Sequence, residues 1–310
     1  LMQLVAYGAQ DIYLTGNAQI TFFKVVYRRH TNFSIESIEQ TFNGHVDFGR
    51  KLTVTVSRNG DLIHKMFLRV VLPALQQDQN GAEWQGYVNS VGNALIKSVE
   101  IEIGGQIVDK HYSEWLEIYG ELTQSDAEYR SYKRLIGKYS TNVSLEANAL
   151  EEKTLYIPLQ FWFCRNPGLA LPLIALQYHE VKLNFEFRGI RELTRSDVEI
   201  VNPLDIDGST PSIRSASLWV DYIYLDTDER RRFAQVSHEY LIEQVQFNEP
   251  EGIDTRSTTL NSALQLNHPV KELLWVVTRN ETRELNTVSG NDLFNFSSTS
   301  GGDTFETAKL

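Results

Sequence analysis

Apolar and polar residues alternate most clearly between Pro167 and Phe187. From residue 179 onward, one face collects His179, Val181, Leu183, Phe185 and Phe187, and the other collects Glu180, Lys182, Asn184 and Glu186. A period of two predicts a half-buried strand, because successive side chains leave a strand on opposite faces. The preceding run PGLALPLIAL holds two prolines, which cannot join a central ladder. We interpret this apolar loop as a surface covered by a neighbouring subunit or by a second domain.

The same alternation predicts strands elsewhere in the chain. Residues 52–56 alternate, Asn59-Gly60 follows, and an apolar run covers 62–72, which together predict a β-hairpin. A strand is expected over Val99–Ile103, followed by the turn Gly104-Gly105 and a return strand at Gln106–Val108. Another is expected over Leu155–Phe163, where Pro158 places it at a sheet edge. Further strands are expected over Leu218–Leu225, Tyr240–Phe247, Leu264–Leu266 and Leu273–Val277.

Helical spacing is rare in this sequence. Ser113–Leu122 places Trp115, Ile118, Tyr119 and Leu122 on one stripe, which predicts a helix buried along that stripe. Asp226 and Glu229 form a capping-box pattern before ERRRFAQ and predict a short second helix. The polar stretches 125–153 and 189–212 are interpreted as surface loops. Many short strands with little helix predict an all-β protein, a jelly-roll β-sandwich.

Charge and cysteine content narrow the class of protein. The formal net charge is −11, from 29 basic and 40 acidic residues, which argues against a general nucleic-acid coat. Cys164 is the single cysteine, so no intramolecular disulfide can form, as expected in a reducing compartment. We expect Cys164 to be a buried small hydrophobe beside Trp162 and Phe163. No apolar run approaches the roughly 20 residues that span a bilayer, and no signal peptide opens the chain, so we expect a soluble, intracellular protein.

Two His-Glu pairs suggest acid–base chemistry. His179-Glu180 lies on a predicted strand, where neighbours point to opposite faces, so His179 is predicted to be a hydrogen-bonded core histidine. If His238 and Glu239 lie on a strand, their side chains also point to opposite faces, so the same objection applies to this pair. A metal site on a jelly roll needs His-x-His with a nearby carboxylate, and the seven histidines never occur in that pattern. We therefore assign no catalytic, cofactor-binding or metal-binding residue, and we expect no enzyme and no cofactor.

Other polar groups also have structural interpretations. Asp226, Asp228 and Glu229 lack the ligand spacing of a calcium loop. Gly104-Gly105 is a turn and not a phosphate-binding loop. Arg230, Arg231 and Arg232 could bind phosphate or an acidic partner. On a short exposed linker helix such residues more often form a solvated face or an interface, and we favour the interface. Glycosylation triplets occur at Asn32, Asn142, Asn280 and Asn295, but such triplets arise often by chance, and none is assigned as a site.

Four long sequence segments show a family resemblance: LVAYGAQDIYLTGNAQITFFKVVYRRHTNFSIESIEQTFNG, PGLALPLIALQYHEVKLNF, LWVDYIYLDTDERRRFAQ and HEYLIEQVQF. They resemble the major capsid proteins of nucleo-cytoplasmic large DNA viruses, and the algal-virus (phycodnavirus) branch is most similar. The resemblance runs from about Leu4 to the end and weakens at 74–94, 125–153 and 189–212. It implies a double jelly roll whose second half is incomplete here, in a C-terminally truncated chain. The expected units are an N-terminal arm (1–24), a first jelly roll (25–226), a linker helix (227–237) and the start of a second jelly roll (238–310).

The resemblance also implies a function. Such proteins are structural: they trimerise into pseudo-hexagonal capsomers of a large icosahedral double-stranded DNA virus. The implied partners are further copies of the chain, minor capsid proteins and, indirectly, an internal virion membrane, without direct nucleic acid or small-molecule substrate. The implied location is the outer capsid shell of the virion, and the host cytoplasm during assembly. A minor capsid protein and a lectin-like, glycan-binding jelly roll are the alternatives, and either would be expected to lack the trimer.

Overall fold

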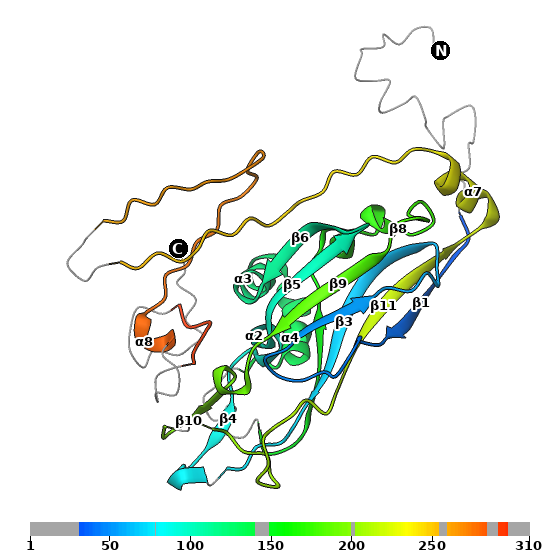
Figure 1. Ribbon diagram of the computed structural model, residues 1–310. Helices are drawn as coiled ribbons and strands as arrows, with labels where there is room; N and C mark the ends of the chain where they lie inside the picture. Colours follow the sequence, from blue (N-terminus) through cyan, green and yellow to red (C-terminus); the bar gives the residue numbers. More distant parts are fainter. Residues whose placement is uncertain are drawn as a thin grey trace.

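Two antiparallel sheets form the body of the protein (Figure 1). The computed structural model describes residues 31–77, 79–139, 149–199, 202–253, 259–283 and 291–296. One sheet has the order β1-β11-β3-β7, built from Phe33–Gln40, Ser215–Leu225, Leu62–Leu72 and Lys153–Pro158, and β8 (Leu171–Pro172) also pairs with β3. The other has the order β2-β9-β5-β6, built from Lys51–Thr55, Val181–Phe187, Ile96–Ile103 and Gln106–Tyr112.

The connections between these strands define a jelly roll. Strands β1 and β3 lie in one sheet, while β2 between them lies in the other, and the crossing recurs at β6 to β7 and at β9 to β11. Eight strands in this arrangement form the two Greek keys of a jelly-roll sandwich. The predicted fold class is therefore confirmed. A separate ribbon pairs β4 (Gln85–Tyr87) with β10 (Thr194–Ser196), and β10 lies within the stretch that the sequence predicted to be a surface loop.

The core lies between the sheets and follows the alternation read from the sequence. In β9, Val181, Leu183, Phe185 and Phe187 are buried while the residues between them are partly exposed. On the facing sheet Leu218, Val220 and Tyr222 of β11 belong to the same buried cluster. Burial of one face on each sheet is what a period of two produces when two sheets pack together.

Both strands of the hairpin predicted over residues 52–72 are present, but they do not pair with each other. β2 pairs with β9 in one sheet, and β3 pairs with β11 and β7 in the other. Asn59-Gly60 therefore lies on a crossing between sheets and not in a hairpin turn. A Cβ on Gly60 would lie 2.8 Å from Cβ of Tyr222, so glycine is required there by close packing.

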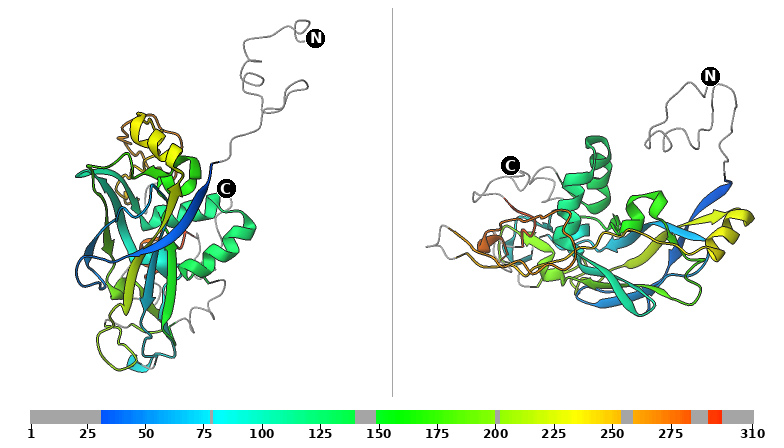
Figure 2. Two further views of the ribbon diagram at one scale, coloured as in Figure 1. Left: turned by 90° about the vertical axis from the view of Figure 1, so that its right-hand side faces the viewer. Right: turned by 90° about the horizontal axis from the view of Figure 1, so that it is seen from above.

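Helices on one side of the sandwich differ from the sequence prediction (Figure 2). The helix α3 (Ser113–Thr123) forms as expected, but its buried residues are Ser113, Leu116, Glu117 and Gly120. The predicted apolar stripe is only partly buried, and Leu122 is 64% exposed. A second helix, α4 (Asp126–Ile136), lies where a loop was predicted. Its capping box joins Ser125 and Glu128, and Gly137 ends it with a φ of 73°.

Short elements complete the described chain. α2 (Val91–Leu95) precedes β5, α6 (Trp162–Arg165) follows β7, and α8 (Asn280–Arg283) lies near the end, with 3-10 turns at Gln79–Gly81, Pro167–Leu169 and Ile190–Glu192. The strand predicted over Leu155–Phe163 thus ends at Pro158, on an edge strand as expected. The predicted linker helix is α7 (Thr227–Gln235), capped by Asp226, whose carboxylate accepts from Thr227 N. The expected arm, 1–24, lies outside the described residues.

Candidate assembly surface

Beyond α7 the chain runs as an extended tract, which we define as residues 236–279 without 254–258. The described residues of this tract form neither helix nor strand, although the sequence predicted strands at Tyr240–Phe247, Leu264–Leu266 and Leu273–Val277. Figure 1 shows two extended runs of the tract beside the sandwich. The predicted strands are extended but lack ladder partners within the part of the chain that the structure describes, and a strand requires such a partner.

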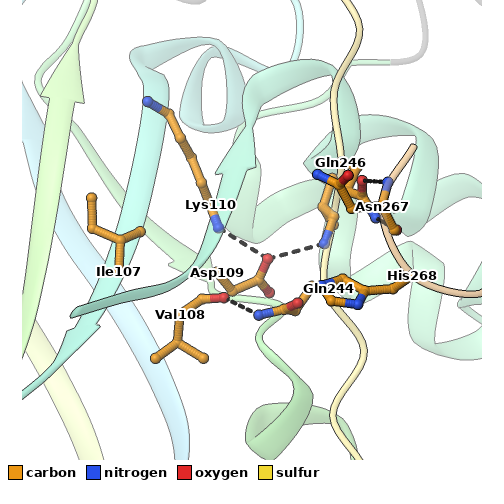
Figure 3. A pocket seen from close by; sticks show the side chains of 9 residues that line it. Ile107, Val108, Asp109, Lys110, Gln244, Gln246, Asn267 and His268 are labelled. Carbon is orange, nitrogen blue, oxygen red and sulfur yellow. Dashed lines mark hydrogen bonds between the residues drawn. The ribbon is translucent and has the colours of Figure 1, made fainter. Parts of the chain in front are cut away.

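The tract contacts the free edge of β6 through side chains. Val245 N donates to Asp109 Oδ1 at 3.0 Å, and the amide of Gln244 donates to Val108 O (Figure 3). The rings of Tyr112 and Phe247 lie 4.6 Å apart. Because residue numbers rise in the same direction along both segments, the tract runs parallel to β6.

A buried histidine supports the carboxylate that holds the tract. His111 Nε2 lies 2.8 Å from Asp109 Oδ2, and both side chains are fully buried. The His111 ring stacks on Phe161 with ring centroids 4.5 Å apart. Asp109 Oδ1 also accepts from Lys110 N. Each oxygen of the Asp109 carboxylate therefore has a hydrogen-bond partner: Oδ1 accepts from the backbone of Val245 and Lys110, and Oδ2 contacts His111.

Ion pairs reinforce the same contact. Arg165 Nη1 lies 2.8 Å from Glu243 Oε2, and Lys271 pairs with the other oxygen of Glu243. The hydrogen bond from Lys271 is the main cause that lowers the pKa of Glu243. The Arg165 guanidinium also lies over the ring of Tyr119, 4.5 Å from its centroid. These charges join α3, α6 and the tract.

An open pocket of about 260 Å³ lies where the tract meets β6 (Figure 3). It is lined by Ile107, Val108, Asp109, Lys110, Gln244, Val245, Gln246, Asn267 and His268. Several of its polar groups bond to one another, since Gln246 contacts the backbone of Asn267 with both side-chain ends. Within the described ranges no group of three or more His, Cys, Asp or Glu could hold a metal ion. The arrangement fits a packing contact between chain segments.

Many apolar side chains of the tract are exposed. Leu241 is 87% exposed and Trp275 is 71% exposed. The other exposed apolar side chains of the tract include Phe247, Ile253, Leu260, Leu264, Val270, Leu273, Leu274, Val276 and Val277. So many exposed apolar side chains along one tract favour a surface that another chain segment or subunit covers. The sequence had identified most of these side chains as strand residues, while Ile253, Leu260 and Val270 lie outside the predicted strands.

The prediction that His179 is a core histidine is wrong. His179 is exposed and precedes β9, which begins at Val181, so it belongs to the loop and not to the strand. Its carbonyl accepts from Arg58, and its ring lies where a Cβ on Gly104 would be 2.5 Å from Nδ1. His238 also lies off any strand, with its ring on Phe233. Gly104 and Gly105 form the predicted turn, both with positive φ.

The run PGLALPLIAL is only partly covered by its own chain, and its predicted contact with a neighbouring subunit or a second domain stays a prediction. Ala170, Leu171 and Leu173 are buried, and Leu171 and Pro172 pair with β3 as strand β8. Ala170 packs in a small cluster with Leu62 and Ile223, against which Phe233 of α7 lies. The two prolines therefore did not prevent pairing, because β8 is a two-residue strand at the side of the sheet.

Remaining candidates occupy structural positions. Cys164 is buried as predicted, and burial raises its pKa to about 12. Arg230 pairs with the buried Asp61 at 2.9 Å, while Arg231 and Arg232 are exposed. Asn295 is buried against Asp292, Asn32 is exposed, Asn280 begins α8, and Asn142 lies outside the described residues.

Among the described segments, no helix has the length and apolar character needed to cross a membrane.

Comparison with known families accounts for both parts of the chain. Residues 21–226 match the family described as the N-terminus of the major capsid protein. Residues 229–310, which include the tract, match the family described as the large eukaryotic DNA virus major capsid protein. The chain belongs to the major capsid protein family of large eukaryotic DNA viruses. The resemblance inferred from the sequence is thereby confirmed.

Individual relatives support this membership. A major capsid protein of Pyramimonas orientalis virus is 56% identical, over 89% of this chain and 64% of the relative. That of Paramecium bursaria Chlorella virus 1 is 49% identical, over 89% of this chain and 60% of the relative. The chain thus spans less than two thirds of the length of these capsid proteins.

Solved structures show the same fold. The quasi-atomic structure of the PBCV-1 virus capsid is similar, with a TM-score of 0.59 and 44% identity over 73% of this chain and 50% of that one. The Faustovirus major capsid protein has a TM-score of 0.54 and 13% identity over 73% of this chain and 60% of that one. At that identity only the fold is comparable.

Proposed function

We propose that this chain is part of the major coat subunit of a large icosahedral double-stranded DNA virus. The observation that supports this most directly is the exposed apolar tract on a jelly-roll body of the capsid family. Apolar surface gains roughly 25 cal/mol per Å² when it is removed from water. A coat protein functions by such burial and needs no catalytic group, so the proposed role is structural and not enzymatic.

The proposed division is an arm (1–24), a first jelly roll (25–226), a linker helix (227–237) and the beginning of a second jelly roll (238–310). The alternating residues near 240–247 and 273–277 support the last unit. In a second jelly roll these extended runs would gain the ladder partners that they lack in the described structure. The exposed apolar side chains of the tract would then enter a second core.

In the proposed capsomer, three such subunits form a ring with pseudo-hexagonal outline. A ring of three identical chains is closed by one surface of each subunit meeting a different surface of the next. The proposed location is the outer shell of the virion, after assembly in the host cytoplasm. Minor capsid proteins are the further proposed partners, and an internal membrane would be contacted indirectly. The net charge of −11 favours a shell that does not bind the genome directly.

Light scattering during gel filtration tests this proposal, on the subunit expressed from its complete reading frame. A mass three times that of the chain, stable on dilution, is expected. A stable monomer would contradict the trimeric capsomer. A glycan array would then examine the lectin-like alternative, and a search for virion partners the minor-capsid alternative.

A further inference from the structure

Residues of the second family region pack into the first jelly roll. The described residues 291–296, which we call the docked segment, lie with α8 beside the end of the sandwich that carries β10 (Figure 1). Leu293 and Phe294 of this segment pack against the main hydrophobic core. The docked segment belongs to the match over 229–310, whereas the strands around this core belong to the match over 21–226. The core of the first jelly roll is therefore extended by side chains from the other family region.

The side-chain amide of Asn291 joins the docked segment to the ribbon of β4 and β10. Its Nδ2 atom donates to Arg191 O at 2.6 Å and to Thr194 O at 2.8 Å. A primary amide carries two N–H groups, so each carbonyl receives its own hydrogen. Asn291 is 4% exposed. In such a buried site the loss of a donor leaves polar groups unpaired, so the contact selects an amide at this position.

The backbone of Asn291 gives a second reason for asparagine. Its φ is 56°, in the left-handed region that most residues with a Cβ avoid. Glycine, asparagine and aspartate are the residues that adopt this conformation most readily. Glycine lacks the amide, and an ionised aspartate presents only acceptors to the two carbonyls. Asparagine therefore meets both requirements at this position.

Asp292 joins the docked segment to α8 and to the ribbon. Its N–H donates to Thr282 O of α8 at 2.9 Å, and its Oδ2 atom lies 3.4 Å from Nη1 of Arg195 in β10. The same Oδ2 atom accepts from Nδ2 of Asn295 at 2.9 Å. Asp292 and Thr282 are both buried. The helix α8 and the docked segment therefore form one packed unit.

A second contact holds α8 to the body of the first jelly roll. Nη2 of Arg283 lies 3.5 Å from Oε1 of Glu114, which lies in the first turn of α3. The same oxygen lies 3.7 Å from Nη2 of the buried Arg188, whose Nη1 atom donates to Ala94 O. Arg188 thereby holds Glu114 where Arg283 meets it. The unit of α8 and the docked segment is thus attached to α3 as well as to the ribbon.

We propose that α8 and the docked segment hold the second family region at a fixed position on the first jelly roll, with Asn291 as the positioning residue. The hydrogen bond from Val245 to Asp109 fixes the first extended run of the tract at β6. A region attached at one place can still rotate about it, and units joined by small interfaces usually move relative to each other. The contacts of Asn291 and Asp292 supply a second attachment, which removes this rotation.

One consequence of the fixed position rests on the proposed function. A ring of three identical subunits closes when one surface of each subunit meets a different surface of the next. Those two surfaces must lie at a constant angle to each other, and a second region held firmly on the first jelly roll keeps that angle constant. The attachment itself is a contact within one chain and is measurable whether or not the subunit trimerises.

Hydrogen exchange in the full-length subunit measures the attachment. Asn291→Ala removes both amide donors, so the amides of Asp292 and Asn295 should exchange about tenfold faster, because the segment opens more often from the ribbon. The amides of β9 should keep their protection, which establishes that the first jelly roll is folded. Asn248→Ala is the matched control, because Asn248 is an exposed asparagine of the extended tract.

Asn291→Gly separates the role of the side chain from that of the backbone. Glycine adopts the positive φ without strain but donates nothing to the carbonyls of Arg191 and Thr194. Exchange at Asp292 is expected to be faster than in the parent, as in Asn291→Ala. Exchange at the parent rate in Asn291→Gly would overturn the role of the amide.

A distance measurement tests whether α8 keeps its position. Spin labels are attached at Lys65→Cys in β3 and Asn280→Cys in α8, since both positions are exposed, whereas the native Cys164 is buried. Pulsed electron paramagnetic resonance should give one narrow distance distribution in the parent and a broad one after Asn291→Ala. The same narrow distribution in both Asn291 variants, or a broad one in the parent, would overturn the fixed position.

Light scattering on the same samples separates this proposal from the proposed function. A monomeric parent combined with fast exchange in Asn291→Ala would contradict the trimeric capsomer and support the attachment. A trimeric parent combined with unchanged exchange in Asn291→Ala would support the capsomer and overturn the attachment.

Discussion

The carboxylate of Asp109 joins two parts of the chain that are 136 residues apart, because its Oδ1 atom accepts from the backbone N–H of Val245 at 3.0 Å. Its Oδ2 atom lies 2.8 Å from Nε2 of the buried His111. A side chain therefore takes the place of a ladder hydrogen bond at the edge of β6. This contact fixes the first extended run of the tract against the jelly roll without making the tract a strand.

Replacing Asp109 is expected to release the tract. Asp109→Ala removes the acceptor for Val245 and leaves His111 buried without its partner, at a cost of about 1–3 kcal/mol in the free energy of unfolding. Amide hydrogen exchange at Val245 should become faster, while the amides of β9 in the same sheet keep their protection. Glu249→Ala is the matched control, because Glu249 is an exposed acidic residue of the same tract. Unchanged exchange at Val245 would show that the aromatic and ionic contacts hold the tract without Asp109.

The strands could be predicted from the sequence and their partners could not. Alternation in β2 and β9 reports that one face of each strand is buried, which is a local property of the chain. Pairing depends on where the chain crosses between the sheets, and Asn59-Gly60 has the sequence of a hairpin turn although it lies on such a crossing. Proximity to Tyr222, and not a positive φ, explains that glycine.

The assembly surface was only partly predictable. The alternation at Tyr240–Phe247 correctly indicated extended chain, but the absence of ladder partners in the described structure depends on the other segments present. His179 was assigned to the core because the strand boundary was placed two residues too early. Helix α4 was missed because its composition is polar, although Ser125, Glu128 and Gly137 were readable as its start and stop signals.

Gly60 is expected to resist replacement by alanine. The new Cβ would lie 2.8 Å from Cβ of Tyr222, whose side chain is fully buried, so Tyr222 or the crossing must move. Such overpacking costs about 1–3 kcal/mol. Thermal unfolding should show a lower midpoint for Gly60→Ala. Gly252→Ala provides the comparison, since a Cβ there meets nothing within 4 Å, and an equal shift in both variants would contradict the packing argument.

Lys153 is expected to destabilise the folded chain below pH 8. Burial lowers the pKa of Lys153 to about 8, although its Nζ atom lies 4.0 Å from the ring centroid of Tyr139. A lysine in the unfolded chain has a pKa of about 10.4, so the unfolded state binds the proton more tightly. The stability contribution of Lys153 therefore rises with pH between about 8 and about 10.4, and its penalty is complete below that window.

Lys153→Met should therefore raise the unfolding midpoint at pH 7, by an amount that shrinks towards pH 10. Denaturant titrations at a series of pH values measure this difference. Lys65→Met is the control, because Lys65 is exposed on β3 and should give no pH-dependent gain. A constant difference between Lys153→Met and the parent at every pH would mean that methionine acts through packing alone.

The buried pair of Glu117 and Lys138 should be more costly to break than to remove. Lys138 Nζ lies 2.6 Å from Glu117 Oε1, and their side chains are 9% and 4% exposed. Burial alone would lower the pKa of Lys138, but the facing Glu117 carboxylate raises it overall. Ser90 and Asn93 also donate to Glu117, at 3.0 and 2.7 Å. The pair thus anchors α3 to the chain around α2 and to the residues that follow α4.

Lys138→Met leaves the Glu117 charge buried without its cation and is expected to cost about 3–5 kcal/mol. The double variant Glu117→Gln/Lys138→Met keeps groups that can bond Ser90 and Asn93. It leaves only the partly exposed Glu121 carboxylate without Lys138, so it should lose much less. Urea denaturation of the parent, both single variants and the double variant gives the coupling energy directly. If Lys138→Met and the double variant lost the same stability, the unpaired Glu117 charge would carry no penalty of its own, and the other contact of Lys138, its ion pair with Glu121, would account for the loss.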